Sequence, residues 1–147
     1  MTQSKSERLQ VVLDMADREE KSATDSVEEI RAKLQAEEEK LQGLINYYDE
    51  YASDFGQSEK LTTARQIQMQ RTFLEKLSEA KAQQQLQIQN VNARLQEKIE
   101  IWRKIYLKNK SLHDYVSRLR LDEQKQLTKK EERLLDDWFT RASRKIT

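Results

Sequence analysis

The sequence predicts an all-α protein, folded as a long two-helix antiparallel coiled-coil hairpin whose second helix extends past the first. Three observations lead to this prediction: the absence of proline, the heptad spacing of apolar residues in two stretches, and a break in heptad phase between them. Without proline, nothing removes a helical hydrogen bond or clashes with the preceding turn. We expect one domain over residues 1–147.

The composition suits a narrow core. Apolar residues make up 36% of the chain and charged residues another 36%. This is too little apolar material for a thick globular core, but it is enough for a two-helix seam, in which two positions of every seven are buried. Intrinsic disorder is the alternative for so polar a chain, and the periodicity of the apolar residues has to distinguish the two.

The first stretch of heptads predicts a helix over about residues 5–55. Twelve of its fourteen seam positions hold apolar or aromatic residues, whereas the composition alone would give about five. Ser4 followed by Glu7 predicts a capping box at the start of this helix. Its seam positions are Leu9, Leu13, Ala16, Glu20, Ala23, Val27, Ile30, Leu34, Glu37, Leu41, Leu44, Tyr48, Tyr51 and Phe55.

The second stretch predicts a helix over about residues 63–126. Eleven of its sixteen seam positions are apolar, where the composition would give about six. Lys81 and Gln84 make the seam weaker in one place, and polar residues in such positions usually lower stability and help to fix the register. The seam positions are Ile67, Gln70, Leu74, Leu77, Lys81, Gln84, Ile88, Val91, Leu95, Lys98, Trp102, Ile105, Asn109, Leu112, Val116 and Leu119.

A turn is expected over about residues 56–62. Gly56 suits the left-handed conformation that ends a helix, and Ser58 suits the capping position of the next helix. Continuing the first heptad series would place a seam residue at Thr62, but the second series starts at Ile67. An offset of five residues is not one that a continuous coiled coil absorbs, so the chain is expected to fold back here.

A hairpin with this turn places Leu13 near Ile105. The second helix is the longer one, so its C-terminal part extends past the first helix. Two alternatives remain for residues 128–145: a separate short helix that begins with a capping box at Thr128 and Glu131, or an extension of the second helix.

The charge is divided unevenly along the chain. Residues 1–60 carry a balance of −7 and residues 61–147 a balance of +8. Two helices of opposite sign laid side by side would attract along their flanks. Two solvated faces, or a basic half that contacts an acidic partner, are the alternatives.

The sequence offers little for catalysis or for binding metals. It has no cysteine and a single histidine, His113, so a zinc site cannot be completed. It has no glycine-rich phosphate loop, and its polar residues fall on helix surfaces without a pocket to exclude water. We therefore expect no enzymatic activity, no cofactor and no metal.

Membrane insertion and nucleic-acid binding are not expected either. No run of residues approaches the roughly 18 apolar residues that a membrane span needs, and the first residues lack the apolar stretch of a secretory signal. A basic cluster lies inside the heptads with acidic residues beside it, and phosphate binding would need a stronger positive stripe. A cytoplasmic location follows by elimination. The cluster consists of Arg103, Lys104, Lys108 and Lys110.

Aromatic residues gather at two places. Near the predicted turn, Tyr47, Phe73 and Ala80 flank the seam and widen its apolar stripe, which is typical of a docking face. Packing over the seam without any function is the equal alternative. Near the C-terminus, Trp138 and Phe139 precede a basic run, which indicates either a contact surface or a short helix that folds back onto its own stem.

Four parts of the sequence resemble the flagellar export protein FliJ family. They are Leu41–Tyr51 (LQGLINYYDEY), Phe73–Leu77 (FLEKL), Trp102 with the basic heptad helix, and Asp136–Lys145 (DDWFTRASRK). The likeness covers nearly the whole chain. It implies an antiparallel coiled coil similar to the central stalk subunit of rotary ATPases, located in the cytoplasm and peripheral to the inner membrane at the flagellar base.

The resemblance also implies partners: the export ATPase hexamer, the cytoplasmic domain of the export gate protein, and export chaperones that the protein escorts. The chain alone is expected to be a monomer. The export gate residues implied are Leu44, Tyr47, Tyr51, Phe73, Leu77, Ala80 and Gln84. The residues implied for the ATPase ring are Arg8, Leu9, Val12, Trp138, Arg141 and Arg144.

Two positions depart from the family pattern, and two other functions stay open. Gly43 lies in mid-helix, where it costs about 1 kcal/mol relative to Ala and can mark a bend, and Gln84 is a weak anchor. The alternatives are the equivalent stalk protein of a virulence type III secretion system and a generic self-associating coiled-coil scaffold.

Overall fold

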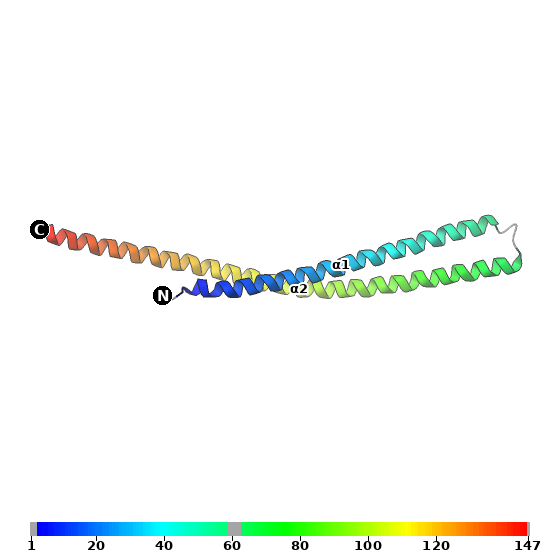
Figure 1. Ribbon diagram of the computed structural model, residues 1–147, viewed down its shortest axis with the longest axis horizontal. Helices are drawn as coiled ribbons and strands as arrows, with labels where there is room; N and C mark the ends of the chain where they lie inside the picture. Colours follow the sequence, from blue (N-terminus) through cyan, green and yellow to red (C-terminus); the bar gives the residue numbers. More distant parts are fainter. Residues whose placement is uncertain (1–2, 59–62, 147) are drawn as a thin grey trace. The chain divides into compact units, whose positions relative to one another are not determined.

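The computed structural model describes residues 3–58 and 63–146. It contains two helices, α1 (Lys5–Ser58) and α2 (Ala64–Ile146), and no strand among the described residues. The helices pack against each other as an all-α hairpin, as the sequence predicts (Figure 1). Within the part of the chain that is described, neither helix has a stretch long and apolar enough to cross a membrane.

The N-terminus of α1 has the predicted capping box. The backbone N–H of Glu7 donates to Ser4 Oγ at 3.2 Å, and the backbone N–H of Ser4 donates to Glu7 Oε2 at 3.2 Å. The pair satisfies two N–H groups that the first turn of a helix leaves without a partner. This local signal therefore fixes where α1 begins.

The predicted turn needs two corrections. α1 continues through Gly56 to Ser58, and no described glycine has a positive φ, so Gly56 does not end the helix. Thr63, not Ser58, caps α2: Thr63 Oγ1 accepts from the backbone N–H of Gln66, and Gln66 Oε1 accepts from that of Thr63, both at 3.3 Å. A Gln three residues after Thr63 allows this reciprocal pairing. Residues 59–62 of the predicted turn lie outside the described residues.

α2 continues without interruption to Ile146, so residues 128–145 extend α2 and do not form a separate helix. Thr128 does not act as a cap. Its Oγ1 donates to the backbone oxygen of Gln124 at 3.0 Å, as a threonine inside a helix commonly does.

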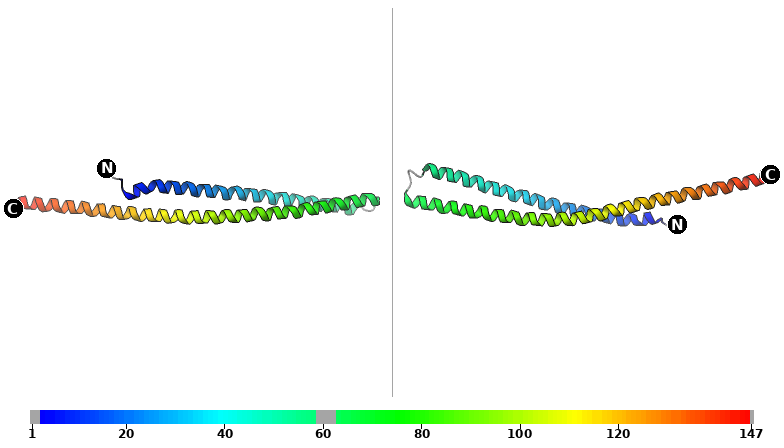
Figure 2. Two further views of the ribbon diagram at one scale, coloured as in Figure 1. Left: turned by 90° about the horizontal axis from the view of Figure 1, so that it is seen from below. Right: turned by 180° about the vertical axis from the view of Figure 1, so that it is seen from behind.

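The chain forms two compact units. The central unit is Ala23–Trp102, and the terminal unit is Met1–Ser22 with Arg103–Thr147. Within each unit a segment of α1 lies beside a segment of α2 (Figures 1 and 2).

The central unit is built on a small apolar cluster of Val27, Ile30, Val91 and Leu95, against which Leu34, Ile99 and Trp102 pack. Two hydrogen bonds give the direction of the helices. Trp102 Nε1 donates to Thr24 Oγ1 at 2.9 Å, and Gln84 Nε2 donates to Glu37 Oε2 at 2.6 Å. Because later residues of α1 lie beside earlier residues of α2, the pairing is antiparallel.

The terminal unit is held by polar bonds around the buried Leu13 and Val116, which are 2% and 1% exposed. The backbone N–H and Oγ of Ser6 donate to the Glu123 carboxylate at 3.1 and 2.5 Å. Farther along, Asp17 and His113 share a hydrogen bond of 2.8 Å. These pairs also run antiparallel.

The predicted heptads identify the buried face correctly. Every residue that is buried among the described ones falls on the heptad series or on its N-terminal continuation. The buried residues are Ser6, Leu13, Val27, Ile30, Glu37, Leu77, Val91, Leu95, Asn109 and Val116.

The register differs from the expected pairing of Leu13 with Ile105. Hydrogen bonds join Gln10 to Arg120 and Asp17 to His113, so Leu13 lies level with a position between those two α2 residues, near Val116. The difference is about eleven residues, or about 16 Å along the helix. Heptads fix which face is buried, but a slide along the seam preserves that face, and the polar seam residues decide the register.

We expect Leu95→Ala to lower the free energy of unfolding by about 2–5 kcal/mol, because Leu95 is 5% exposed and its truncation leaves a cavity in the seam. Leu86→Ala is the matched control on the same helix: Leu86 is 59% exposed, and its change should stay within about 0.5 kcal/mol. Urea unfolding followed by far-UV circular dichroism measures both. Equal effects of the two substitutions would contradict the seam assignment.

Candidate functional site: two apolar surfaces

The aromatic patch lies in the central unit and consists of the seven residues expected for the export gate: Leu44, Tyr47, Tyr51, Phe73, Leu77, Ala80 and Gln84. Its centre is a three-ring cluster. Phe73 of α2 lies 4.6 Å from Tyr51 and 6.2 Å from Tyr47 between ring centroids, and it meets Tyr47 edge to face at 82°. Such geometry stabilises aromatic pairs beyond their buried area.

The members of the aromatic patch differ in exposure. Leu77 is buried in the seam, whereas Leu44, Tyr51, Phe73, Ala80 and Gln84 are half-buried and Tyr47 is 49% exposed. Leu77 therefore supports the surface from below. Tyr47 is the most accessible member of the patch, and the half-buried residues around it are partly accessible to a partner.

Gln84 has a role in the seam. Its Nε2 donates to the backbone oxygen of Glu37 at 2.9 Å and to the Glu37 carboxylate at 2.6 Å. Glu37 is 8% exposed and also lies 3.6 Å from Lys40 Nζ. The bond from Gln84, aided by the nearby Lys40, holds the pKa of Glu37 below its usual value. Gln84 thus joins the two helices beside the patch.

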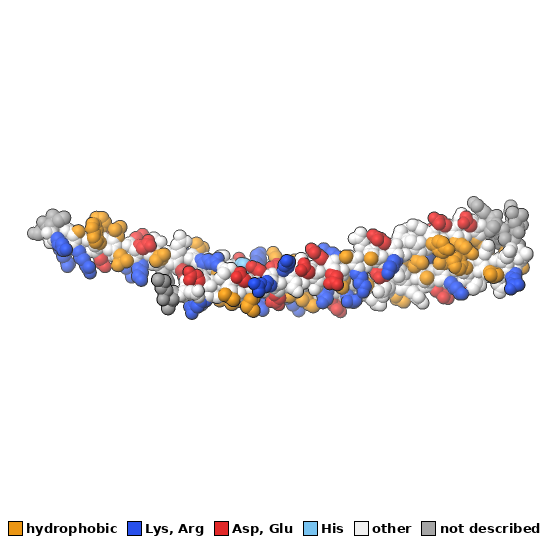
Figure 3. All heavy atoms as spheres, in the orientation of Figure 1, with side chains coloured by type: hydrophobic (Ala, Val, Ile, Leu, Met, Phe, Trp, Pro, Cys, Tyr) orange, Lys and Arg blue, Asp and Glu red, His pale blue; other side chains and the backbone are white. Residues whose placement is uncertain are grey.

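The structure adds Met69, which the sequence reasoning missed. Met69 is 64% exposed and lines two shallow grooves together with Phe73. The sequence could have indicated Met69, because it lies four residues before Phe73 and the two therefore share one side of α2. Figure 3 shows hydrophobic side chains gathered on one face over the end of α1 and the start of α2.

Gly43 lies one residue before Leu44 of the aromatic patch. α1 passes through it as a continuous helix, and a Cβ built there would meet nothing within 4 Å. No close approach of another chain segment explains the glycine.

The residues expected for the ATPase ring all belong to the terminal unit, but the structure does not bring them together. Arg8, Leu9 and Val12 lie on the first turns of α1, whose Ser6 is bonded to Glu123. Trp138 lies fifteen residues farther along α2 than Glu123, about 22 Å by helical rise. The two groups are therefore separate surfaces.

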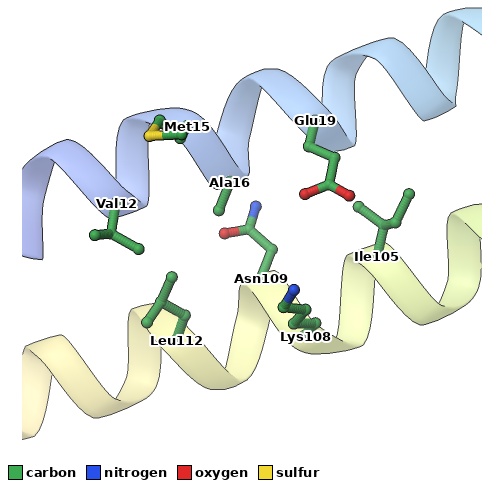
Figure 4. Close-up of a pocket in the computed structure, with 8 residues that line it drawn as sticks. All are labelled: Val12, Met15, Ala16, Glu19, Ile105, Lys108, Asn109 and Leu112. Atoms are coloured by element: carbon green, nitrogen blue, oxygen red, sulfur yellow. The ribbon is translucent and has the colours of Figure 1, made fainter.

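The first of these surfaces borders a groove of about 470 Å³ between α1 and α2. Val12, 44% exposed, and Ala16 point towards Leu112 and Asn109 across it (Figure 4). Met15 is 62% exposed on its rim and was also missed. Leu9 is half-buried and Arg8 is exposed.

The second surface is the C-terminal tail, defined here as residues 124–146 of α2. Side chains from Gln124 to Arg141 are all exposed, and Arg144 is exposed as well. Trp138 and Phe139 are 62% and 59% exposed and meet edge to face at 5.2 Å. The tail has not folded back onto its own stem, so its aromatic residues face solvent.

The remaining polar cluster is structural. Asn109 is 4% exposed and donates through Nδ2 to Asp17 at 3.0 Å and to Glu20 at 2.6 Å. The bonds from Asn109 and then His113 lower the pKa of Asp17. No group of three or more His, Cys, Asp or Glu residues within the described ranges is arranged to hold a metal ion.

The fold and its surfaces define an antiparallel helical hairpin with apolar faces exposed in both units. The sequence model of the family described as Flagellar FliJ protein matches residues 4–145. The chain therefore belongs to the flagellar FliJ family, and it is a flagellar export-related protein. No curated protein and no solved structure matches the chain significantly.

We expect the thermal stability to fall as the pH drops through about 4.5 and below. The pKa values of Asp17, Glu37 and Glu123 are lowered in the folded chain, the last by the hydroxyl and then the backbone N–H of Ser6. A carboxyl with a lowered folded pKa stabilises the fold above its unfolded pKa and loses that contribution as the pH falls through the folded value.

Circular dichroism melts between pH 3 and 7 measure this dependence. Glu37→Gln should flatten the acid limb of the curve, because the amide cannot titrate. Glu38→Gln is the matched control, since the Glu38 side chain is exposed, and its curve should follow that of the unchanged chain. An acid limb that Glu37→Gln leaves intact would contradict the role of this carboxyl.

Proposed function

We propose that this FliJ-family protein is a non-enzymatic, stalk-like adaptor of the flagellar type III export apparatus, which binds both the export ATPase ring and the cytoplasmic domain of the membrane export gate. The observation that carries the proposal is the presence of two exposed apolar surfaces on separate units of one hairpin. The aromatic patch belongs to the central unit and the C-terminal tail to the terminal unit. Two partners can therefore be bound through different residues.

The aromatic patch is the proposed gate-binding surface. Tyr and Phe supply large contact areas at interfaces, and a few such residues usually carry most of the binding energy. Tyr47 is half-exposed, while Tyr51 and Phe73 hold it in place by ring contacts. A surface that is already ordered loses less side-chain entropy on binding.

The termini are the proposed ATPase-binding region. The tail presents Trp138 on an exposed helix together with Arg141 and Arg144, while Val12 lines the groove of the same unit. Trp and Arg are the residue types most enriched at the energetic centres of interfaces. A protruding single helix suits insertion into the central opening of a ring.

Export chaperones are further proposed partners, and the proposed location is the cytoplasmic side of the inner membrane at the flagellar base. The flagellar family match favours this function over a virulence-type stalk. The burial of seam residues within one chain favours a hairpin that folds alone over an obligate coiled-coil scaffold.

We expect Tyr47→Ala with Phe73→Ala to weaken binding to the purified gate domain by at least about tenfold, because the double change removes the ring cluster. Tyr115→Ala is the matched control, since Tyr115 is 48% exposed and lies in the terminal unit. Calorimetric titration measures binding, and far-UV circular dichroism checks helicity. Full-strength gate binding by the double variant would refute the patch assignment.

We expect Trp138→Ala to weaken binding to the assembled ATPase ring by a similar factor of about ten, because Trp138 is the largest exposed side chain of the tail. The two variants control each other: the Trp138 variant should keep its gate binding, and the Tyr47/Phe73 variant its ring binding. Sedimentation with the ring measures the second interaction. Loss of both interactions in either variant would speak against two separate surfaces.

A further inference from the structure

The C-terminal tail and the turn of α2 that precedes it carry a wide apolar face, and no other described part of the chain covers it. Six large apolar side chains from residue 121 onwards are between 56% and 62% exposed. The last five are related by spacings of three, four and seven residues, and Leu121 lies fourteen residues before Leu135, so all six fall on one side of the helix. They are Leu121, Leu127, Leu134, Leu135, Trp138 and Phe139.

Two of these spacings form a coiled-coil seam. Leu127 and Leu134 are seven residues apart, and Trp138 lies four residues after Leu134. The remaining position of the seam between them is Glu131, the one charged residue within the apolar face. A face of this kind suits a second helix laid along it, with Glu131 as the point where the fit is weakest.

The residues beside this seam carry charges whose order would match a second, antiparallel copy of the same helix. Lys130 and Asp137 are seven residues apart on the same edge of the apolar face, and both are exposed. Glu123 lies seven residues before Lys130, and Arg144 lies seven residues after Asp137. Along this edge the charges therefore alternate from negative at Glu123 to positive at Arg144. When two copies of this edge run antiparallel, every position meets the opposite charge. A parallel pair would set each residue level with its own copy.

We propose that the tail pairs antiparallel with the tail of a second copy of the chain. Trp138 of one copy packs beside Leu127 of the second copy, Leu134 packs beside the second copy's Glu131, and Lys130 forms an ion pair with the second copy's Asp137. The arrangement is two-fold symmetric, so each of these contacts occurs twice. The Ser6 bonds to Glu123 lie at one end of the paired segment and do not involve the central Lys130 and Asp137.

The available area sets the strength of this dimer. Of the six large apolar side chains, three lie on the seam of each copy: Leu127, Leu134 and Trp138, which are 57%, 61% and 62% exposed. The paired surface is therefore small beside the roughly 1,200–2,000 Å² of stable, specific interfaces, which predicts weak association. The chain is therefore a monomer when dilute, as its self-contained seam requires, and a dimer when concentrated.

Dimerisation goes beyond the proposed adaptor function and competes with it for one surface. Trp138 is covered in the dimer and needed for the ring, so a ring would bind the chain only after the tails separate. The paired state would hold the apolar face of the tail out of solvent until that partner is present.

Sedimentation equilibrium of the full chain over about 1 to a few hundred µM tests the proposal. The mass should rise from 17.5 kDa towards twice that value. Glu131→Leu should tighten the association by at least about tenfold, because it completes the apolar seam. A gain of affinity cannot be explained by misfolding of the variant.

Charge reversal tests the antiparallel order. Lys130→Asp and Asp137→Lys should each weaken the dimer by about tenfold, and the double variant should restore it, because the ion pairs re-form with their signs exchanged. Lys129→Asp, on the opposite side of the tail, is the control and should leave the association unchanged. A chain that stays at 17.5 kDa throughout, or an association that these variants do not alter, overturns the proposal. Either result leaves ring binding by Trp138 untouched and separately measurable.

Discussion

The hairpin depends on a few polar side chains that bond across a narrow apolar seam. In the central unit, Gln84 of α2 donates to the backbone and the carboxylate of Glu37 in α1. In the terminal unit, Asn109 donates to Asp17 and Glu20 while its Oδ1 has no partner. A buried oxygen without a hydrogen bond is costly, so Asn109 is not explained by stability alone. Its value lies in register, since a slide along the seam would leave these groups unpaired.

The register set in each unit decides which surfaces exist. In the central unit it brings Phe73 into contact with Tyr47 and Tyr51, which lie on the other helix. In the terminal unit it places Glu123 at the N-terminus of α1, where the carboxylate accepts from the Ser6 N–H and is favoured by the helix dipole. All of α2 beyond that point has no α1 residue beside it. The tail is thus exposed because the polar pairs fix a register in which α1 begins beside Glu123.

Much of the fold could be predicted from the sequence because its determinants are local or periodic. The Ser4 capping box and the heptads depend on spacing alone, and both are present. The prediction that Gly56 ends the first helix was wrong, because a glycine permits the left-handed conformation without requiring it. α1 continues through Gly56 to Ser58. The pairing of Leu13 could not be predicted, because it depends on which distant polar residues meet. The aromatic patch was found from its flanking positions, whereas Met69 lies outside the heptads and gives only a weak signal.

Exposed apolar residues carry different meanings in different parts of this chain. Leu86 is exposed singly on α2, and scattered residues of this kind are normal on a protein surface. The tail differs, because Leu127, Leu134 and Trp138 have the seven- and four-residue spacing of a seam, in a heptad phase shifted from that of Val116 and Leu119, where no α1 residue lies beside them. A helix that carries the apolar spacing of a seam beyond its own partner has a face shaped for another helix. The pattern of the apolar residues, more than their number, therefore marks the tail as a binding surface.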